Sequence, residues 1–254
     1  MKFSRSTSGP WNATRLTCSD SGLRKDRLST FTVNSYVRTV NVFLSWARAE
    51  GEQVSAKGKL ARTPQKLVET LTREEILSME RIANHRDALI VRLLADTGIR
   101  AGELCGLQID DLIERERHDY LRVTGKGDKE RLVPVPAPAA RRLRRYIRSR
   151  SSESTKGFVF ISLRRGRSGE YEPISVSALD QMIRSLAKNA GISRRVYPHM
   201  FRHTYITELL RRGVDATKIR RVVGHGNTYL IDTVYGHLVE ADLADSVLAA
   251  LGRQ

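Results

Sequence analysis

Cysteine is almost absent from this 254-residue sequence, and several other common signals are missing with it. Its two cysteines, Cys18 and Cys105, cannot form a disulfide framework, and their spacing does not suggest zinc. The apolar runs are short: Ala88–Ala95 contains Arg92 and is far below the length of a membrane span. Met1–Pro10 is polar and lacks the apolar region of a secretory signal. These absences predict a soluble, cytoplasmic protein.

Motifs for nucleotide and metal binding are also missing. The sequence has no G-x-x-x-x-G-K-[S/T] phosphate loop, and the Gly-x-Gly at 224–226 has no third glycine. His199 and His203 have a spacing that can bind zinc on a helix, but Met200 stands where the glutamate of that motif would be. The sequence therefore predicts neither a cofactor nor a metal.

Acidic residues are scarce relative to basic ones. The chain carries 44 Lys and Arg against 28 Asp and Glu, a formal net charge of +16, and 40% of its residues are hydrophobic, enough for a core. The excess is uneven: residues 1–70 have a net charge of +7, residues 71–140 of −2 and residues 141–254 of +11. Such a distribution is typical of a polyanion binder. A basic protein without a nucleic-acid partner is the alternative on charge alone.

Apolar periodicity predicts a mainly helical chain with a small antiparallel β-sheet. A capping box, Thr72 with Glu75 three residues later, opens one helix. Short β-prone runs at Tyr120–Val123 and Arg131–Val135 flank a Gly-Lys-Gly-Asp turn and predict a hairpin, and Phe158–Ser162 is a further predicted strand. The other predicted helices are Phe31–Gly51, Asp87–Ala95, Ala101–Leu107, Ala137–Ser149, Ser177–Asn189, His199–Arg211, Ala216–Val223, one through Tyr235, and Ala241–Leu251.

Several polar residues interrupt these apolar patterns. Arg100 lies between two apolar helices and Arg202 lies in another, where a charge is costly unless it is paired. His199, His225 and Tyr235 occur in similar settings. Each has an ordinary structural explanation, such as a buried ion pair, a core histidine or a packed tyrosine. Taken together in a strongly basic chain, they suggest a phosphodiester substrate.

Four motifs contain these residues. They are Thr97–Leu104 (TGIRAGEL), Gly125–Pro134 (GKGDKERLVP), Pro198–Thr204 (PHMFRHT), and Gly224-His225 followed by Tyr235-Gly-His237. Their order and spacing resemble those of the tyrosine recombinase (phage integrase) family, with the greatest similarity to its Xer-like and integron- or phage-type members. The resemblance covers Leu71 to Leu251. It implies the α+β fold of a tyrosine recombinase catalytic domain and the function of a site-specific DNA recombinase.

The resemblance implies roles for two arginines and two histidines. Arg100 and Arg202 match the pair that holds the scissile phosphate, a task that suits a planar, always charged guanidinium. Such groups also offset the charge that grows in the transition state. His199 and His225 match the family's histidine positions, which contact the same phosphate and assist proton transfer near neutral pH.

Two further roles concern the nucleophile and the general acid. Tyr235 matches the nucleophile; its phenol is mostly protonated at neutral pH, so nearby cations and a base must help it ionise. Tyr229 is a rival, but it precedes the Tyr-x-His pattern. Lys126 matches the general acid that protonates the leaving 5′ oxygen, with Lys129 as the less favoured alternative.

Three other features support the predicted site less directly. Glu103 matches an acidic family position and is interpreted as a partner that orients Arg100, with a plain buried ion pair as an equal alternative. His203 is expected to support the site or the fold rather than to react. The basic run Arg141–Arg150 is either a DNA-facing helix or a solvated face.

The implied reaction needs neither a metal nor ATP. The tyrosine attacks a backbone phosphate, forms a 3′-phosphotyrosyl bond and frees a 5′ hydroxyl, and strands are exchanged through a Holliday junction. The implied partners are double-stranded DNA, which places the protein at the nucleoid, and further copies of the chain in a homo-tetramer. In that assembly Ala241–Leu251 would dock on the neighbouring subunit.

The N-terminal part departs from the family pattern. Members carry a helical core-binding domain, of which Phe31–Gly51 resembles only the last helix. We therefore divide the chain into residues 1–30, a mobile arm or eroded region; residues 31–68, a remnant of the core-binding domain plus linker; and residues 69–254, the catalytic domain. A naturally shortened recombinase, a fragment and a misplaced start all fit this pattern. The functional alternatives are a truncated or non-catalytic DNA-binding accessory protein and a topoisomerase-like enzyme.

Overall fold

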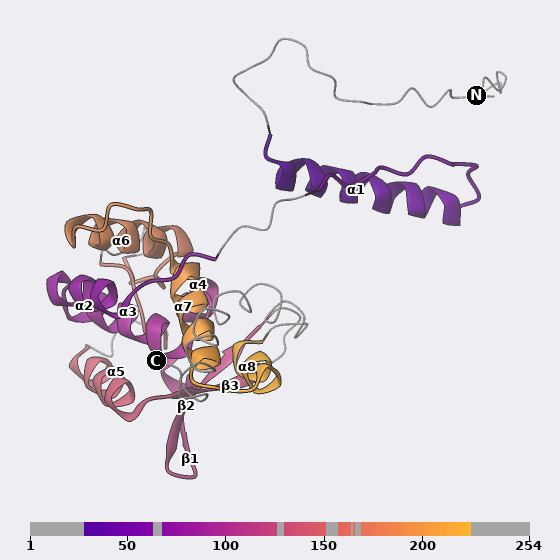
Figure 1. The fold of residues 1–254 in the computed structure, drawn as a ribbon. Helices are drawn as coiled ribbons and strands as arrows, with labels where there is room; N and C mark the ends of the chain where they lie inside the picture. The colour runs from indigo at the N-terminus through magenta and orange to yellow at the C-terminus, as the bar shows by residue number, and fades with distance from the viewer. Residues whose placement is uncertain are drawn as a thin grey trace, which may run out of the picture. The chain divides into compact units, whose positions relative to one another are not determined.

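A computed structural model describes residues 28–62, 68–125, 130–150, 157–163, 165 and 169–224. The chain divides into two compact units, residues 1–66 and residues 67–254 (Figure 1). Most of the arm predicted for residues 1–30, the predicted helix through Tyr235 and the predicted helix Ala241–Leu251 lie outside the described residues. No helix in the described part is long and apolar enough to cross a lipid bilayer.

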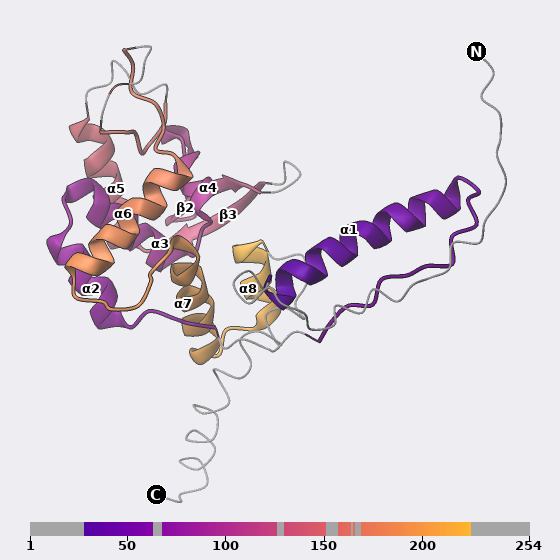
Figure 2. The ribbon, with the colours of Figure 1, turned by 90° about the horizontal axis from the view of Figure 1, so that it is seen from above.

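The described part of the first unit is one helix and the segment that returns along it. Helix α1 (Thr30–Ala49) begins after Ser29, whose hydroxyl accepts a hydrogen bond from the N–H of Thr32 at 3.2 Å. Its bounds lie within two residues of the predicted helix. Residues 52–62, here called the strap, run back beside α1 (Figure 2). Three polar side chains of the helix bind the strap backbone: Asn34, Asn41 and Arg48.

The second unit contains seven α-helices in its described part. They are α2 (Arg73–Ile82), α3 (His85–Thr97), α4 (Ala101–Cys105), α5 (Ala137–Ser149), α6 (Val176–Asn189), α7 (Pro198–Arg211) and α8 (Ala216–Val223). For α2 only the start was predicted. The predicted bounds of the other six helices agree within two residues, and those of α5 and α8 agree fully. The predicted capping box is present before α2: the Thr72 hydroxyl accepts from the Glu75 N–H at 3.2 Å, and the Glu75 carboxylate accepts from the Thr72 N–H at 2.8 Å.

A short 3₁₀ helix, η1 (Ile109–Asp111), leads into a three-stranded antiparallel sheet of order β1-β2-β3. The strands are β1 (Leu112–Arg115), β2 (His118–Thr124) and β3 (Glu130–Val135). The predicted hairpin is confirmed as β2 and β3, but the sequence did not predict β1. The turn between β1 and β2 places Glu116 and Arg117 at φ 50° and 65°. Such left-handed turn positions usually carry Gly or Asn, so the sequence gives no hairpin signal here.

The strand predicted at Phe158–Ser162 is wrong. This segment forms only isolated bridges, between Gln108 and Phe158 and between Ile161 and Pro173. Val159 and Phe160 are both completely buried. The apolar run therefore reflects core packing of an irregular segment, which periodicity alone cannot distinguish from a short buried strand.

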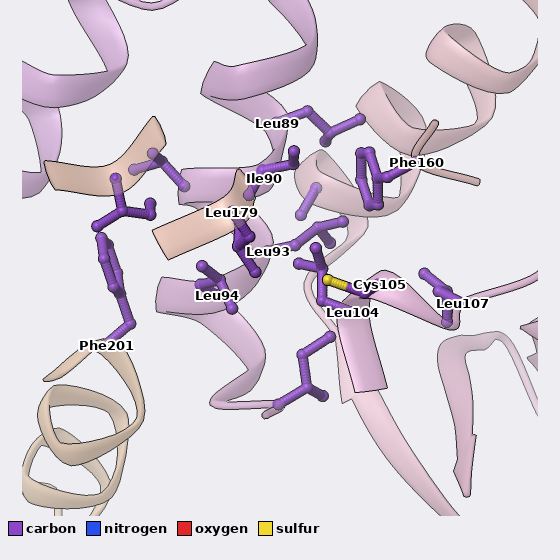
Figure 3. Close-up of a cluster of buried hydrophobic side chains, with 14 of the residues drawn as sticks. Leu89, Ile90, Leu93, Leu94, Leu104, Cys105, Leu107, Phe160, Leu179 and Phe201 are labelled. Atoms are coloured by element: carbon purple, nitrogen blue, oxygen red, sulfur yellow. The ribbon is translucent and has the colours of Figure 1, made fainter. Parts of the chain in front are cut away.

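Helix α3 lies at the centre of the second unit. It packs against α2, α5, α7 and β3. Leu89, Ile90, Leu93 and Leu94 of α3 meet apolar side chains from α4, α6, α7 and the segment around Phe160 (Figure 3). This core fixes the end of α3 relative to the starts of α4 and α7. Arg100 lies at the start of α4, and Arg202 lies in the first turns of α7.

Candidate active site

Arg202 is the most deeply buried of the predicted catalytic residues that the structure describes. Its side chain projects from the first turns of α7 and the residue is 1% exposed. Its Nη1 donates to the carbonyl of Gly98 at 2.9 Å, and its Nη2 donates to the carbonyl of Val223 at 2.5 Å. These carbonyls lie at the C-terminal ends of α3 and α8, where unpaired carbonyls and the helix dipole favour a cation. Backbone oxygens therefore hold this guanidinium in place.

Arg100 stands at the start of α4 and is more open. Its Nη1 donates to Oε1 of Glu103 at 2.9 Å, and its Nη2 donates to the carbonyl of Gly224 at 2.9 Å. Its side chain is 39% exposed, so the guanidinium is accessible from solvent. Arg100 and Arg202 thus bind the carbonyls of two consecutive residues, Gly224 and Val223, at the end of α8.

Glu103 binds two arginines at once. Besides Arg100, it receives both Nη atoms of Arg131, each at 2.8 Å from one carboxylate oxygen. Burial by itself would raise the pKa of this carboxyl, whose side chain is 5% exposed. The hydrogen bonds from Arg131 and from the Arg100 backbone, with the charge of Arg131, outweigh burial and lower its pKa to about 2. This geometry fits both interpretations of Glu103: a partner that orients Arg100 and a member of a buried ion pair.

Arg131 belongs to this cluster, and the sequence reasoning did not single it out. Its signal was the strand alternation: in β3 the inward positions are Arg131, Val133 and Val135, while Leu132 points outward. An arginine on the buried face of a strand requires partners. Arg131 finds them in Glu103 and in the carbonyl of Val222, which accepts from its Nε at 2.7 Å.

Two histidines lie one turn apart on α7. The rings of His199 and His203 meet edge to face, with centroids 4.5 Å apart and planes at 80°. Desolvation of the His199 ring and the positive charges of Arg202 and Arg100 lower its pKa. Among the residues that the structure describes, no three His, Cys, Asp or Glu side chains are grouped so that they could hold a metal ion.

The structure describes three of the six predicted catalytic residues, and it brings these three together: Arg100, His199 and Arg202. The other three, Lys126, His225 and Tyr235, lie outside the described residues, as do their rivals Lys129 and Tyr229. The residues that adjoin two of these segments are described. Gly224, which precedes His225, binds Arg100, and Arg131 lies on β3, which begins soon after Lys126 in the sequence.

Comparison with known proteins identifies the family. The sequence pattern of the phage integrase family matches residues 69–241. The chain belongs to the phage integrase family. Tyrosine recombinase XerA of Pyrococcus horikoshii is 32% identical over 207 residues, which cover 81% of this chain and 70% of that protein. Its namesake from Thermococcus kodakarensis is 34% identical over 208 residues, with the same coverage.

Solved structures agree with this membership of the phage integrase family. The crystal structure of XerA recombinase has a TM-score of 0.60 at 30% identity and covers 87% of this chain and 76% of its own. XerH site-specific recombinase, in a post-cleavage complex with a palindromic difH substrate, has a TM-score of 0.71 at 21% identity, covers 87% and 67%, and so supports the fold. The predicted fold class and enzyme class, a tyrosine recombinase that cleaves and rejoins DNA, are confirmed.

The basic helix α5 of this integrase-family chain has two kinds of arginine. Arg144 pairs with Asp119, and Arg142 pairs with Glu80 at 3.4 Å. The others on the helix are exposed and fall on one side at intervals of four and three residues: Arg141, Arg145 and Arg148. A DNA-facing helix and a solvated basic face both fit this pattern.

Proposed function

We propose that this chain is a site-specific recombinase that cleaves DNA through Tyr235 and exchanges strands through a Holliday junction. The tyrosine oxygen attacks the phosphorus, the bond from phosphorus to the 5′ oxygen breaks, and a 3′-phosphotyrosyl bond forms. The phosphoester energy is retained in that bond, so a 5′ hydroxyl of a partner strand can reverse the step. The reaction written in this way requires neither a metal ion nor a nucleotide.

One observation carries the proposal. The guanidinium groups of Arg100 and Arg202 both bind at the end of α8, immediately before His225, and both charges act on His199. Two cations and a histidine at one place match what a phosphate in a pentacoordinate transition state requires. Arg202, fixed by two carbonyls, would supply a rigid positive site, and the more exposed Arg100 would contact the phosphate from the solvent side.

The proposed acid–base roles follow from the same charges. The lowered pKa of His199 favours a neutral ring at pH 7, and a neutral ring has a lone pair that can accept the proton of the tyrosine. We assign His225 to the same phosphate and Lys126 to protonation of the 5′ oxygen. We propose that Glu103 orients Arg100 and that His203 supports His199 through the contact between their rings.

The proposed partners are double-stranded DNA and further copies of the chain. The net charge of +11 over residues 141–254 supports a polyanion partner. Two solved structures of the same fold contain DNA: XerH with a palindromic difH substrate and the Tn1549 transposon integrase with a circular intermediate DNA. We further propose a homo-tetramer on DNA in which Ala241–Leu251 docks on the neighbouring subunit, and a location at the nucleoid. Family membership favours the enzyme over a non-catalytic accessory protein.

The proposed domain division follows the same reasoning. Residues 69–254 would form the catalytic domain, and α1 with the strap would be the remnant of a core-binding domain. The compact unit that begins at Leu67 agrees with this boundary. Because contacts of a strongly basic chain with phosphates release counterions, DNA binding by this chain should weaken steeply with salt.

A covalent-trapping experiment tests the catalytic role of Tyr235. The chain is incubated in EDTA with a pool of labelled, nicked duplexes of randomised sequence, in which loss of the short strand beside the nick makes cleavage irreversible. The expected result is a protease-sensitive protein–DNA adduct, which Tyr235→Phe abolishes and Tyr229→Phe retains. An adduct that survives in Tyr235→Phe, or its absence from the unsubstituted chain, would contradict the proposal.

A further inference from the structure

Arg131 connects three segments of the second unit that are far apart in sequence. It belongs to β3, its two Nη atoms bind the carboxylate of Glu103 in α4, and its Nε binds the carbonyl of Val222 in α8. Its side chain is 12% exposed. All three nitrogens of one planar group are used, each toward a separate acceptor atom. A lysine could not reproduce this arrangement, because its ammonium is a single point of charge.

The same side chain also packs against Gly224. This glycine caps α8 with φ 68°, and a Cβ there would lie 3.1 Å from Cδ, Nε and Nη1 of Arg131. Glycine is therefore needed both for the left-handed backbone and for the close approach of the guanidinium. The carbonyl of this same Gly224 accepts the hydrogen bond from Arg100. Arg131 thus touches both groups that hold Arg100: Glu103 and Gly224.

Charge balance explains what this arrangement achieves. One carboxylate, Glu103, lies between two guanidinium groups, so the cluster of Arg100, Glu103 and Arg131 has a net charge of +1. Without Arg131 the remaining pair would be neutral. The backbone N–H of Arg100 already donates to Oε2 of Glu103, and its guanidinium donates only Nη1, to Oε1. Without Arg131, the guanidinium would be free to bind both carboxylate oxygens and to leave Gly224. The phosphate would then contact a neutral ion pair instead of the fixed, positively charged guanidinium of Arg100.

We infer that Arg131 is a positioning residue for phosphate binding: by occupying Glu103 and fixing the end of α8, it holds the Arg100 guanidinium toward the scissile phosphate. This inference rests on the proposed function. It assigns Arg131 an effect through Arg100, although Lys126 lies closer to Arg131 in the sequence.

Two substrates separate an effect through Arg100 from a general loss of activity. Duplexes carrying the sequence captured in the trapping experiment are prepared with either the normal scissile phosphodiester or a neutral methylphosphonate. The methylphosphonate lacks the non-bridging charge that a guanidinium would hold. Arg131→Lys and Arg131→Met should slow adduct formation on the phosphodiester about 100-fold, the cost of misplacing a group by about 1 Å. On the methylphosphonate their rates should fall within about threefold of the unsubstituted chain, as for Arg100→Ala.

A neighbouring arginine provides the matched control. Arg122 on β2 forms its ion pair at 3.1 Å with Asp111 rather than with Glu103. Arg122→Met should leave both rates unchanged. Equal losses of the Arg131 variants on the two substrates, or no loss on either, would overturn the inference. So would loss of folding in both variants, because Arg131 would then act on stability. If the unsubstituted chain forms no adduct, the proposed function fails instead.

Discussion

Helices α1 and α3 both present an apolar face in the sequence, but they differ in how much of it is covered. On α3, the central pair Leu93 and Leu94 is completely buried against the rest of its unit. On α1, Tyr36 and Phe43 are each 60% exposed and Val40 is 51% exposed. Apolar periodicity therefore predicted both helices correctly without showing which of the two faces is buried among the described residues.

The covered side of α1 has the buried Ala47 and a line of polar side chains. Asn34 and Asn41, seven residues apart, each exchange two hydrogen bonds with one strap residue, Ala61 and Gly58 respectively, at 2.7–2.9 Å. Another seven residues on, Arg48 donates to two further strap carbonyls. Because seven residues are about two helical turns, these side chains form a line along the helix. In the described residues, hydrogen bonds from α1 to the strap backbone join these two segments of the first unit, whereas the second unit has an extensive apolar core.

The largest expected difference between the helices comes from deleting apolar atoms. Leu94→Ala should lower the free energy of unfolding of the second unit by about 3 kcal/mol, because it leaves a cavity in a fully packed core. Val40→Ala on α1 should change stability by less than about 0.5 kcal/mol, because the side chain is already half exposed. Urea titrations of the full chain followed by circular dichroism measure both. A comparable loss for Val40→Ala would mean that the α1 face is covered in solution.

The comparison also shows what sequence reasoning could reach. Element positions depend on local signals, and α5 and α8, whose bounds were predicted to the residue, have such signals: prolines at the start of α5 and a glycine at the end of α8. β1 was missed because its turn uses Glu116 and Arg117 in place of Gly or Asn. Whether the apolar face of a helix is buried depends on residues that are distant in sequence, and no local pattern in α1 indicates it.

In the candidate site, too, local motifs were predictive and contacts between distant residues were not. The motifs identified Arg100, His199 and Arg202, whose residue types suit a phosphate, and the structure brings these three together. The role of Arg131 could not be predicted, because its partners Glu103 and Val222 lie 28 and 91 residues away in the chain. A single sequence contains no signal for such contacts.

Acid should affect the two regions differently. The pKa of Glu103 falls from 4.5 to about 2 in the folded chain, so its contribution is fully present above pH 4.5 and is lost as the pH falls from 4.5 toward 2. A shift of this size corresponds to about 3 kcal/mol. The polar contacts of α1 from Asn34 and Asn41 involve neutral amides, which do not titrate in this range.

The free energy of unfolding, measured between pH 6 and pH 2, checks this expectation. The difference in stability between the unsubstituted chain and Glu103→Gln should shrink as the pH falls below 4.5, since only the carboxylate loses its charge. Glu116→Gln, at a turn where the side chain is 83% exposed, is the control and should follow the unsubstituted profile. A constant difference between Glu103→Gln and the unsubstituted chain would show that the carboxylate is not held in its charged form.

The smallest expected effect is a local one in the strap. Asn41→Ala removes the acceptor of the Gly58 N–H and the donor to its carbonyl, and two such bonds on a partly exposed helix are worth about 1 kcal/mol. Amide exchange at Gly58 should therefore accelerate about fivefold, since local opening controls it, while amides of α3 keep their rates. Ser45→Ala is the matched control, because its hydroxyl donates only to the Asn41 carbonyl within α1. If Gly58 exchanges at the same rate in Asn41→Ala and Ser45→Ala, the line of polar side chains does not hold the strap, and the contrast between the two units would rest on apolar burial alone.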